Sequence, residues 1–415
     1  MSARPSLKAA APGAAAAGPA AGRAALAAGF LVVAALVGTL AFLLARGVGL
    51  ERALTPIEEL TVQRIELPAP HHLRIHVVNG GIDAITVNQL AIDDAVWSFT
   101  ITPAARIPRL GRAVLDVPYP WVEGEAHEIK LISRNGVAFF GAIPVATESP
   151  RATRRWVWQL ALLGVYVGVI PVALGLATFP FLRRLGPRGM DFLLALTVGL
   201  LVFLAVDTLA EALELAGDVP GAFHAPVLVW VVALAALVGL VAFAARWRVR
   251  RGGLTPLAVA GFIALGIGLH NLGEGLAIGA ALATGAVGLG TFLIVGFTLH
   301  NITEGIGIAA PLLRTRPRVV DFAGLALVAG GPAVLGCWIG GFVFNPLWAS
   351  LFLAVGAGAI LQVIWEVGRL IAAPAGRPST GQAPAAAGGL WRGEVLAGAA
   401  LGLALMYLTA LLVPA

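Results

Sequence analysis

Long apolar segments recur along most of the chain and are separated by short polar stretches that are rich in arginine. The first of them covers residues 24–46. Eight more follow residue 155, at 156–182, 190–213, 224–245, 254–283, 287–312, 319–344, 348–371 and 393–413. A run of about 20 apolar residues can cross a bilayer as one helix. The pattern therefore predicts an α-helical polytopic membrane protein in which one anchor helix precedes an eight-helix bundle at 156–415.

Residues 47–155 follow a different pattern, with charged residues and short runs in which apolar and polar positions alternate. Leu73 and Ile75, for example, alternate with polar neighbours, and the turn sequence Asn-Gly-Gly follows at 79–81. About seven runs of this kind, each bounded by turn residues, are typical of a small β-sandwich. We expect this domain to lie in water, outside the cytoplasm.

Composition agrees with a membrane protein and removes several alternatives. Hydrophobic residues make up 59% of the chain and charged residues 12%, and the mean hydropathy is +0.89. A soluble domain is nearer half apolar and a quarter charged. The net charge of +6 reflects a small excess of 28 Lys and Arg over 22 acids, so no nucleic-acid partner is expected. The single cysteine, Cys337, lies in an apolar segment and excludes an internal disulfide and a thiolate metal cage.

The arginines predict the orientation of the chain. If the N-terminus is cytoplasmic, most arginine-bearing loops after residue 182 face the cytoplasm, as the positive-inside rule requires. The exception is the arginine group at 151–155, beside the β-domain. The cleavage site of a signal peptide is missing after the first apolar segment, which favours an uncleaved anchor. We therefore expect a multi-pass inner-membrane protein with a disordered cytoplasmic tail at 1–23 and a flexible cytoplasmic linker at 372–389.

Two apolar segments carry the same polar motif, "HNLGEG" at 270–275 and "HNITEG" at 300–305. Ionisable groups at membrane depth are costly and are functional candidates by default. Within each motif, His and Glu are four positions apart and Asn lies three before Glu, so the three side chains share one helical face. The six polar residues are His270, Asn271, Glu274, His300, Asn301 and Glu304.

The two motifs are expected to meet in space. Each lies roughly 10 to 18 residues from the turn predicted near 284–286, so adjacent antiparallel helices would bring them to the same depth. Nitrogen and oxygen ligands with two carboxylates suit Zn²⁺, Fe²⁺ or Mn²⁺. Interhelical hydrogen bonding without a metal is the alternative, and two copies of the motif in neighbouring helices make it the weaker interpretation.

The paired motifs resemble the ZIP (ZRT/IRT-like) family of divalent metal transporters, especially its bacterial branch with "HNxPEG" in the fourth and fifth family helices. "DTLAEALE" at 207–214 and "GAGAILQVIWEVGRL" at 356–370 are also similar to family sequences, and the resemblance covers about 156–413. It implies that the six motif residues bind metal as transported substrate, with no resident cofactor. It further implies that Glu366 is a carboxylate on the cytoplasmic side of the pathway and that Asp207 and Glu211 are an entrance pair. Metal would enter from outside and leave inward, as one group of helices moves against the rest.

Several positions depart from the family pattern. Gly273 and Thr303 replace the motif prolines, Trp365 stands where the family often has His, and Gly331-Pro332 replaces a Glu-Pro pair. Kinks that open backbone carbonyls must then come from elsewhere. The missing carboxylate leaves three consequences open: a single-metal site, altered selectivity or a weakened transporter.

The residues also bear on functions other than transport. A membrane-anchored metal sensor or binding module could act through the β-domain without transport. An enzyme is not expected, because no nucleophile motif or soluble cleft accompanies the histidines. His71, His72 and His76 could capture metal, although scattered surface histidines are the commoner explanation. The expected partners are a divalent metal ion and the lipid bilayer, and a homodimer is compatible with the sequence.

Overall fold

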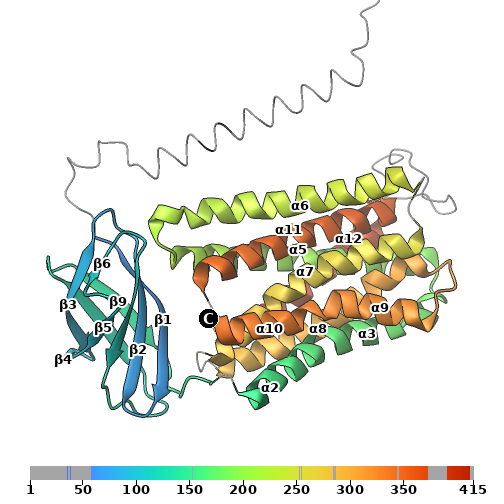
Figure 1. Ribbon diagram of the computed structural model, residues 1–415. Coiled ribbons are helices and arrows are strands. Elements are labelled where there is room, and N and C mark those ends of the chain that lie inside the picture. Colours follow the sequence, from blue (N-terminus) through green and yellow to red (C-terminus); the bar gives the residue numbers. More distant parts are fainter. Residues whose placement is uncertain are drawn as a thin grey trace, which may run out of the picture. The chain divides into compact units, whose positions relative to one another are not determined.

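The computed structural model describes residues 58–151, 153–251, 253, 255–283, 287–343, 345–372 and 390–411, together with Ala35 and Gly38. The predicted tail at 1–23, the predicted anchor apart from those two residues, and the predicted linker from residue 373 lie outside the described residues. The described chain has a sheet region followed by a larger helical region (Figure 1).

The sheet region consists of two antiparallel sheets. Its strands are β1 (Leu60–Ala69), β2 (His72–Asn79), β3 (Ile85–Ile92), β4 (Ala95–Trp97), β5 (Thr100–Thr102), β6 (Arg106–Ile107), β7 (Arg112–Val117), β8 (His127–Ser133) and β9 (Ala138–Ile143). One sheet has the order β1-β2-β7-β5, and the other has β4-β3-β8-β9 with β6 paired to β3. Alternate residues of both sheets form one buried core, so the predicted antiparallel domain is confirmed.

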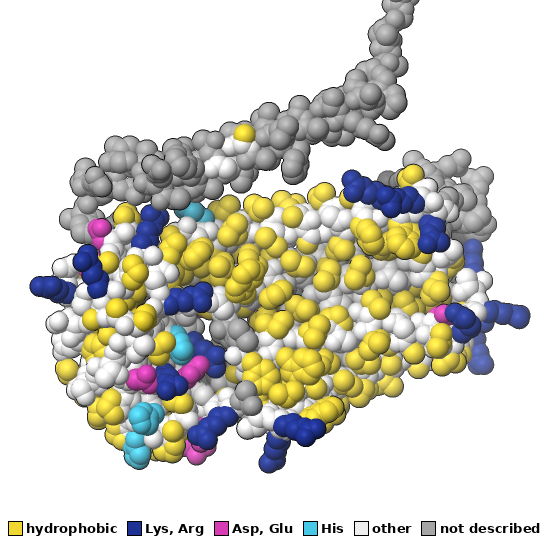
Figure 2. Space-filling view, in the orientation of Figure 1, with side chains coloured by type: hydrophobic (Ala, Val, Ile, Leu, Met, Phe, Trp, Pro, Cys, Tyr) yellow, Lys and Arg dark blue, Asp and Glu magenta, His cyan; other side chains and the backbone are white. Residues whose placement is uncertain are grey.

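The helical region contains every apolar segment that the sequence predicts after residue 155. Its helices are α2 (Arg154–Gly164), α3 (Ile170–Ala177), α4 (Phe179–Leu182), α5 (Pro187–Gly217), α6 (Ala225–Arg250), α7 (Pro256–Ala283), α8 (Val287–Ala309), α9 (Val319–Gly330), α10 (Pro332–Val343), α11 (Pro346–Ala372) and α12 (Gly393–Ala410). Among the described residues, seven helical stretches are long and apolar enough to cross a membrane, and Gly393–Leu408 is a shorter apolar helix. This is the pattern of a multi-pass membrane protein. Figure 2 shows apolar side chains spread over the helical region, with Lys and Arg gathered toward its ends.

Two of these stretches are interrupted rather than regular. A π-helical turn at Val165–Val169 separates α2 from α3, and α9 ends just before Pro332, where α10 begins. Proline has no backbone N–H and clashes with the carbonyl one turn earlier. A π-turn likewise leaves a carbonyl without its usual partner. The motif helices α7 and α8, which lack proline inside their motifs, continue through them without a break.

Glycines bring some helix pairs into backbone contact. A Cβ added at Gly275 of α7 would lie 2.1 Å from the carbonyl oxygen of Ala333 in α10, and one at Gly175 of α3 would lie 2.1 Å from that of Ile302 in α8. No side chain fits at such distances, so these helix pairs are locked closely together. We call the helices from α2 to α3 and from α7 to α10 the motif group.

The remaining long helices form a second set, which we call the outer group: α5, α6, α11 and α12. Glycine contacts of the same kind join its members, with an added Cβ at Gly402 of α12 lying 2.2 Å from the carbonyl oxygen of Leu196 in α5. Between the two groups the glycine contacts are looser, and the nearest backbone atom to an added Cβ is 3.2 Å away at Gly266 and 3.4 Å away at Gly356. An added Cβ at Gly273 of α7 would lie 3.0 Å from a side-chain atom, Cδ2 of Leu353 in α11. Side chains can rearrange more readily than backbone.

Candidate metal centre

The two sequence motifs meet between α7 and α8, and Glu274 is the residue that joins them. His270 donates a hydrogen bond from Nε2 to Glu274 Oε1 at 3.0 Å, and His300 donates to the same oxygen at 2.5 Å. The His270 pair is the i, i+4 contact that the motif spacing predicts. The contact from His300 crosses from one helix to the next. None of the six motif residues exposes more than 5% of its surface.

The two asparagines are held by carbonyl groups at the helix interruptions. Asn271 donates from Nδ2 to the carbonyl oxygen of Ala329 at 3.0 Å, three residues before Pro332. Asn301 donates from Nδ2 to the carbonyl oxygen of Val167, inside the π-turn, at 3.1 Å. It also donates to Glu274 Oε2 at 3.2 Å. The broken helices beside the motif helices thus supply the acceptors that orient both amides.

Several buried acceptor atoms at the centre have no hydrogen-bond partner among the described residues. They are both carboxylate oxygens of Glu304, Oδ1 of Asn271 and Oδ1 of Asn301, and Nδ1 of His270 is also unpartnered. The Asn271 side chain lies close enough to Glu304 for a weak hydrogen-bonding interaction, but the well-formed hydrogen bond of its Nδ2 is to the carbonyl oxygen of Ala329. An unsatisfied buried acceptor costs about 1–3 kcal/mol, and more when it is charged. Oxygen atoms that lie close together without hydrogen-bond donors can instead be satisfied by a bound cation.

The spacing of the candidate ligands fits one metal ion. His270, His300 and Glu304 each offer an atom, and these three atoms lie within 4.8 Å of one another. Metal–ligand bonds of about 2.0–2.2 Å place two ligand atoms at most about 4.4 Å apart. The separations of these three atoms are therefore in the range that one ion requires, or close to it. The asparagine oxygens and Glu274 are further oxygen donors within the same hydrogen-bonded cluster.

Asp207 and Glu211 lie on α5, outside this cluster. Asp207 is exposed and Glu211 is half-buried. Both carboxylates are close enough to interact electrostatically with His270, and Glu211 also with Glu274. The structure therefore places the predicted entrance pair in the neighbourhood of the centre without making it part of the converging ligands.

Glu366 is separate from the cluster and is paired with arginines. It exposes 5% of its surface, and its Oε1 lies 3.7 Å from Arg248 of α6 and 3.7 Å from Arg369 of its own helix. The neighbouring Trp365, at the position where the resembled family often has histidine, is 56% exposed and is not among the buried polar residues. Glu366 is thus a buried carboxylate engaged by two guanidinium groups.

Sequence reasoning missed the groups that position the motif side chains. The carbonyls of Val167 and Ala329 are backbone atoms, and no residue type marks them. Gly331-Pro332 was a usable signal for a break near Ala329, whereas the apolar sequence around Val167 gives none. Nothing in the sequence indicates that Arg248 pairs with Glu366, because Arg248 belongs to a group of arginines that indicates only the orientation of the chain in the membrane.

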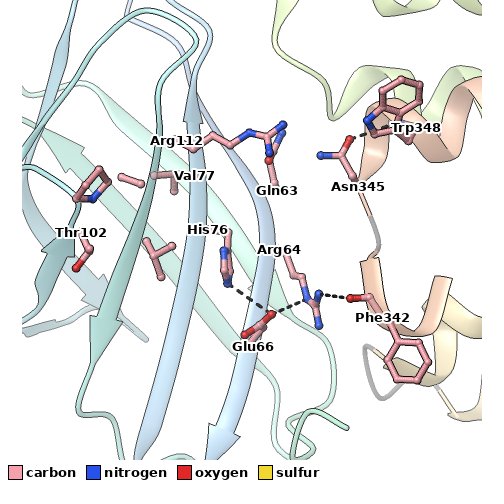
Figure 3. A pocket seen from close by; sticks show the side chains of 13 residues that line it. Gln63, Arg64, Glu66, His76, Val77, Thr102, Arg112, Phe342, Asn345 and Trp348 are labelled. Carbon is pink, nitrogen blue, oxygen red and sulfur yellow. Dashed lines mark hydrogen bonds and ion pairs between the residues drawn. The ribbon is translucent and has the colours of Figure 1, made fainter. Parts of the chain in front are cut away.

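The sheet region has a polar cluster of its own, in the cleft that Figure 3 shows. Glu66 accepts contacts from Arg64 Nε at 3.1 Å and from His76 Nε2 at 3.5 Å. The hydrogen bond from His76, helped by the charge of Arg64, holds the pKa of Glu66 below its ordinary value. His71 and His72 are exposed. Within the described ranges, the group formed by His270, His300 and Glu304 is the one set of three candidate metal ligands, and the histidines of the sheet region do not form another.

Comparison of the chain with protein-family models and with curated proteins finds no match.

Proposed function

We propose that this protein carries a divalent transition-metal cation across a membrane, toward the cytoplasm, through the centre between α7 and α8. One observation carries the proposal: buried nitrogen and oxygen acceptors converge without donors, inside helices long enough to span a bilayer. Buried polar atoms of this kind are rare in folded proteins and call for an explanation. A cation that visits the centre supplies one.

The donor set favours a particular class of ion. Glu274 and Glu304 provide two carboxylates, which balance one divalent charge, and the histidines provide imidazole nitrogens. Cys337, the one cysteine of the chain, is fully buried in α10 and is not among the converging ligands. A site with imidazole and carboxylate but no thiolate suits Zn²⁺, Fe²⁺ or Mn²⁺. The metal is the transported substrate and not a resident cofactor.

The packing of the helices offers a way to move the ion. The motif group carries all six ligands and is held together by close backbone contacts at glycines, whereas the glycine contacts with backbone of the outer group are looser, at 3.2 Å or more. A displacement of one rigid group past the other would carry the centre from one side of the membrane to the other. The resemblance of both motifs to the ZIP family supports the same mechanism, with metal entering outside and leaving at the cytoplasmic face.

The proposal is tested by metal accumulation in cells that express the protein at matched levels. Cells are exposed in turn to Zn, Fe, Mn, Co and Cd, and their metal content is compared with that of cells expressing Glu304→Gln. Glu394→Gln, on α12 and away from the motifs, is the matched control. We expect accumulation of one or two metals that is lost in Glu304→Gln and kept in the control.

A metal sensor acting through the sheet region would give a different result. The purified protein would bind metal through the same residues, but vesicles containing it would take up no more metal than empty vesicles. Equal accumulation by the wild-type protein and Glu304→Gln would contradict transport through this centre.

A further inference from the structure

A buried polar residue without partners lies between the metal centre and Glu366. Gln362 of α11 exposes 1% of its surface, and neither its amide oxygen nor its amide nitrogen has a hydrogen-bond partner among the described residues. Its Oε1 would lie 2.8 Å from a Cβ added at Gly266 of α7, one helical turn from His270. Glu366 follows Gln362 one turn later on α11. A line of buried polar groups thus runs from the metal centre to Glu366.

The line of buried polar groups ends at Glu366, beside a group of arginines. Arg248 approaches Glu366 from α6 and Arg369 approaches it from within α11, each at 3.7 Å. At this same end of α11, the Ile371 carbonyl accepts a hydrogen bond from Arg392, which also pairs with Asp191 near the start of α5. One carboxylate facing two guanidinium groups leaves the local charge positive. A cation arriving from the metal centre would be repelled there.

Aromatic rings pack next to this charged group. Phe262 of α7 lies edge-on to Phe243 and Trp247 of α6, with ring centroids 5.7 and 6.3 Å apart. Trp247 directly precedes Arg248, and Phe262 lies one turn before Gly266. The rings tie α6, from the outer group, to α7, from the motif group. A shift between the two groups would therefore separate the rings beside Arg248. Arg248, Gln362 and Glu366 all belong to the outer group, so it is the side chain of Arg248, and not its helix, that would change position relative to the polar line.

We propose that Arg248, assisted by Arg369, is an electrostatic gate on Glu366 that closes the polar line beyond Gln362. In the closed arrangement the guanidinium groups occupy the carboxylate. When Arg248 moves away, Glu366 becomes free to attract a divalent cation that passes Gln362. The guanidinium of Arg248 and the cation therefore compete for the same carboxylate. The identity of the passing cation rests on the proposed transport function, but the closure by Arg248 does not.

The gate is tested by the accessibility of position 362. Gln362→Cys is made together with Cys337→Ala, and the full-length protein in detergent is treated with a trimethylammonium thiosulfonate, a small cationic thiol reagent. We expect slow labelling when Arg248 is present and labelling at least about tenfold faster when Arg248→Ala is added, because a positive barrier has been removed. Arg248→Lys should remain slow. Arg250→Ala, an exposed arginine on the same helix, is the matched control and should leave the rate unchanged.

Two results would overturn the gate: fast labelling with Arg248 in place, or slow labelling that Arg248→Ala does not change. Ala359→Cys, one turn from Gln362 and also beside Gly266, is a second reporter if the first variant does not elute as a single species. Failure of the transport proposal is recognised separately. Glu304→Gln should abolish metal binding without altering the labelling rate, whereas Arg248→Ala should alter labelling and leave metal binding intact.

Discussion

The motifs on α7 and α8 have the same residues at the same spacing, yet their carboxylates are in opposite situations. Glu274 accepts hydrogen bonds from His270, His300 and Asn301, and both of its oxygens are used. Glu304 is equally buried, and neither of its oxygens has a hydrogen-bond partner in the described part of the chain. One motif therefore holds the centre together while the other leaves its carboxylate available.

This difference arises from the neighbours and not from the motifs. His300 and Asn301 of α8 both donate to Glu274 of α7, which also accepts from His270 of its own helix. One carboxylate thus accepts from donors on two helices. Asn271 of α7 makes no equally well-formed hydrogen bond to Glu304, and its Nδ2 donates to the Ala329 carbonyl. We infer that Glu274 positions both imidazoles, and that Glu304 is the carboxylate available to the ion. The predictions below test this division of roles.

The largest effect is expected for Glu304→Gln. The substitution keeps the shape of the side chain but removes a buried negative charge from the centre. Removing one partner of a buried ion pair costs about 3–5 kcal/mol, which corresponds to an affinity loss of at least about 100-fold. Calorimetric titration of the purified protein with Zn²⁺ or Mn²⁺ measures the loss. An affinity within a few-fold of wild type would show that Glu304 is not a ligand.

Glu274→Gln should act first on the metal-free protein. An amide at this position places an N–H₂ group against donors, and hydrogen bonds to a charged acceptor contribute about 1.5–3 kcal/mol each. We expect a loss of about 3 kcal/mol in stability, read as a fall of several degrees in apparent Tm without metal. Glu304→Gln is the matched comparison and should not lower the metal-free Tm, because no hydrogen bond is lost. Equal destabilisation by both substitutions would remove the distinction between the two carboxylates.

Substitutions of the two asparagines should also lower the metal-free stability to different extents, but the difference should be smaller than that between the two glutamates. Asn301→Ala frees the Val167 carbonyl and also removes a donor from Glu274, whereas Asn271→Ala frees only the Ala329 carbonyl. A buried unpaired carbonyl costs about 1–3 kcal/mol, so Asn271→Ala should be the milder of the two. Metal-free thermal denaturation of both variants gives the order. The reverse order would mean that Asn301 does not support Glu274.

The sequence predicts the parts of this centre that follow from periodicity. The spacing of His270 and Glu274 places them on one helical face, and the structure contains that contact at 3.0 Å. The helical segments after residue 155 are predicted from apolar runs of about 20 residues, and the antiparallel domain from the alternation of apolar and polar residues; both patterns are visible in the residues themselves. The calculated separation from the turn also indicated that the motifs could meet.

What the sequence does not contain is the identity of the partners. The spacing is the same in both motifs, so it cannot show that Glu274 has three donors and Glu304 none. The Val167 carbonyl becomes an acceptor only because a π-turn forms in an apolar stretch, and the pairing of Glu366 with Arg248 joins helices far apart along the chain. Contacts of this kind depend on tertiary packing. The order of residues along the chain does not show which distant segments pack together, so it does not predict these contacts.

Asp93 of the sheet region is also a carboxylate that accepts a hydrogen bond from a histidine, but unlike Glu274 it is exposed to solvent. Asp93 accepts from Nδ1 of His127 at 2.8 Å, from the backbone N–H of Glu128 at 2.9 Å and from the hydroxyl of Tyr119 at 3.0 Å. Burial alone would raise the pKa of Asp93, but these hydrogen bonds outweigh it and lower the pKa below the ordinary 3.8. Burial and the neighbouring Asp93 raise the pKa of Tyr119 to about 12, so its hydroxyl remains a donor at neutral pH.

A lowered carboxyl pKa stabilises the folded state above the unfolded pKa, and that stabilisation disappears as the pH falls through the folded value. Asp93→Asn should therefore weaken the sheet region at pH 7, and the difference from wild type should vanish as the pH falls through the lowered pKa of Asp93. The effect should be the smallest of the four, because the Asp93 side chain is 45% exposed and solvent screens it. Hydrogen exchange of β8 in the full chain, compared between variants at each pH, measures it. Asp94→Asn is the control: both residues have a positive φ that asparagine tolerates, so a loss of protection in both variants would point to the turn and not to the His127 contact.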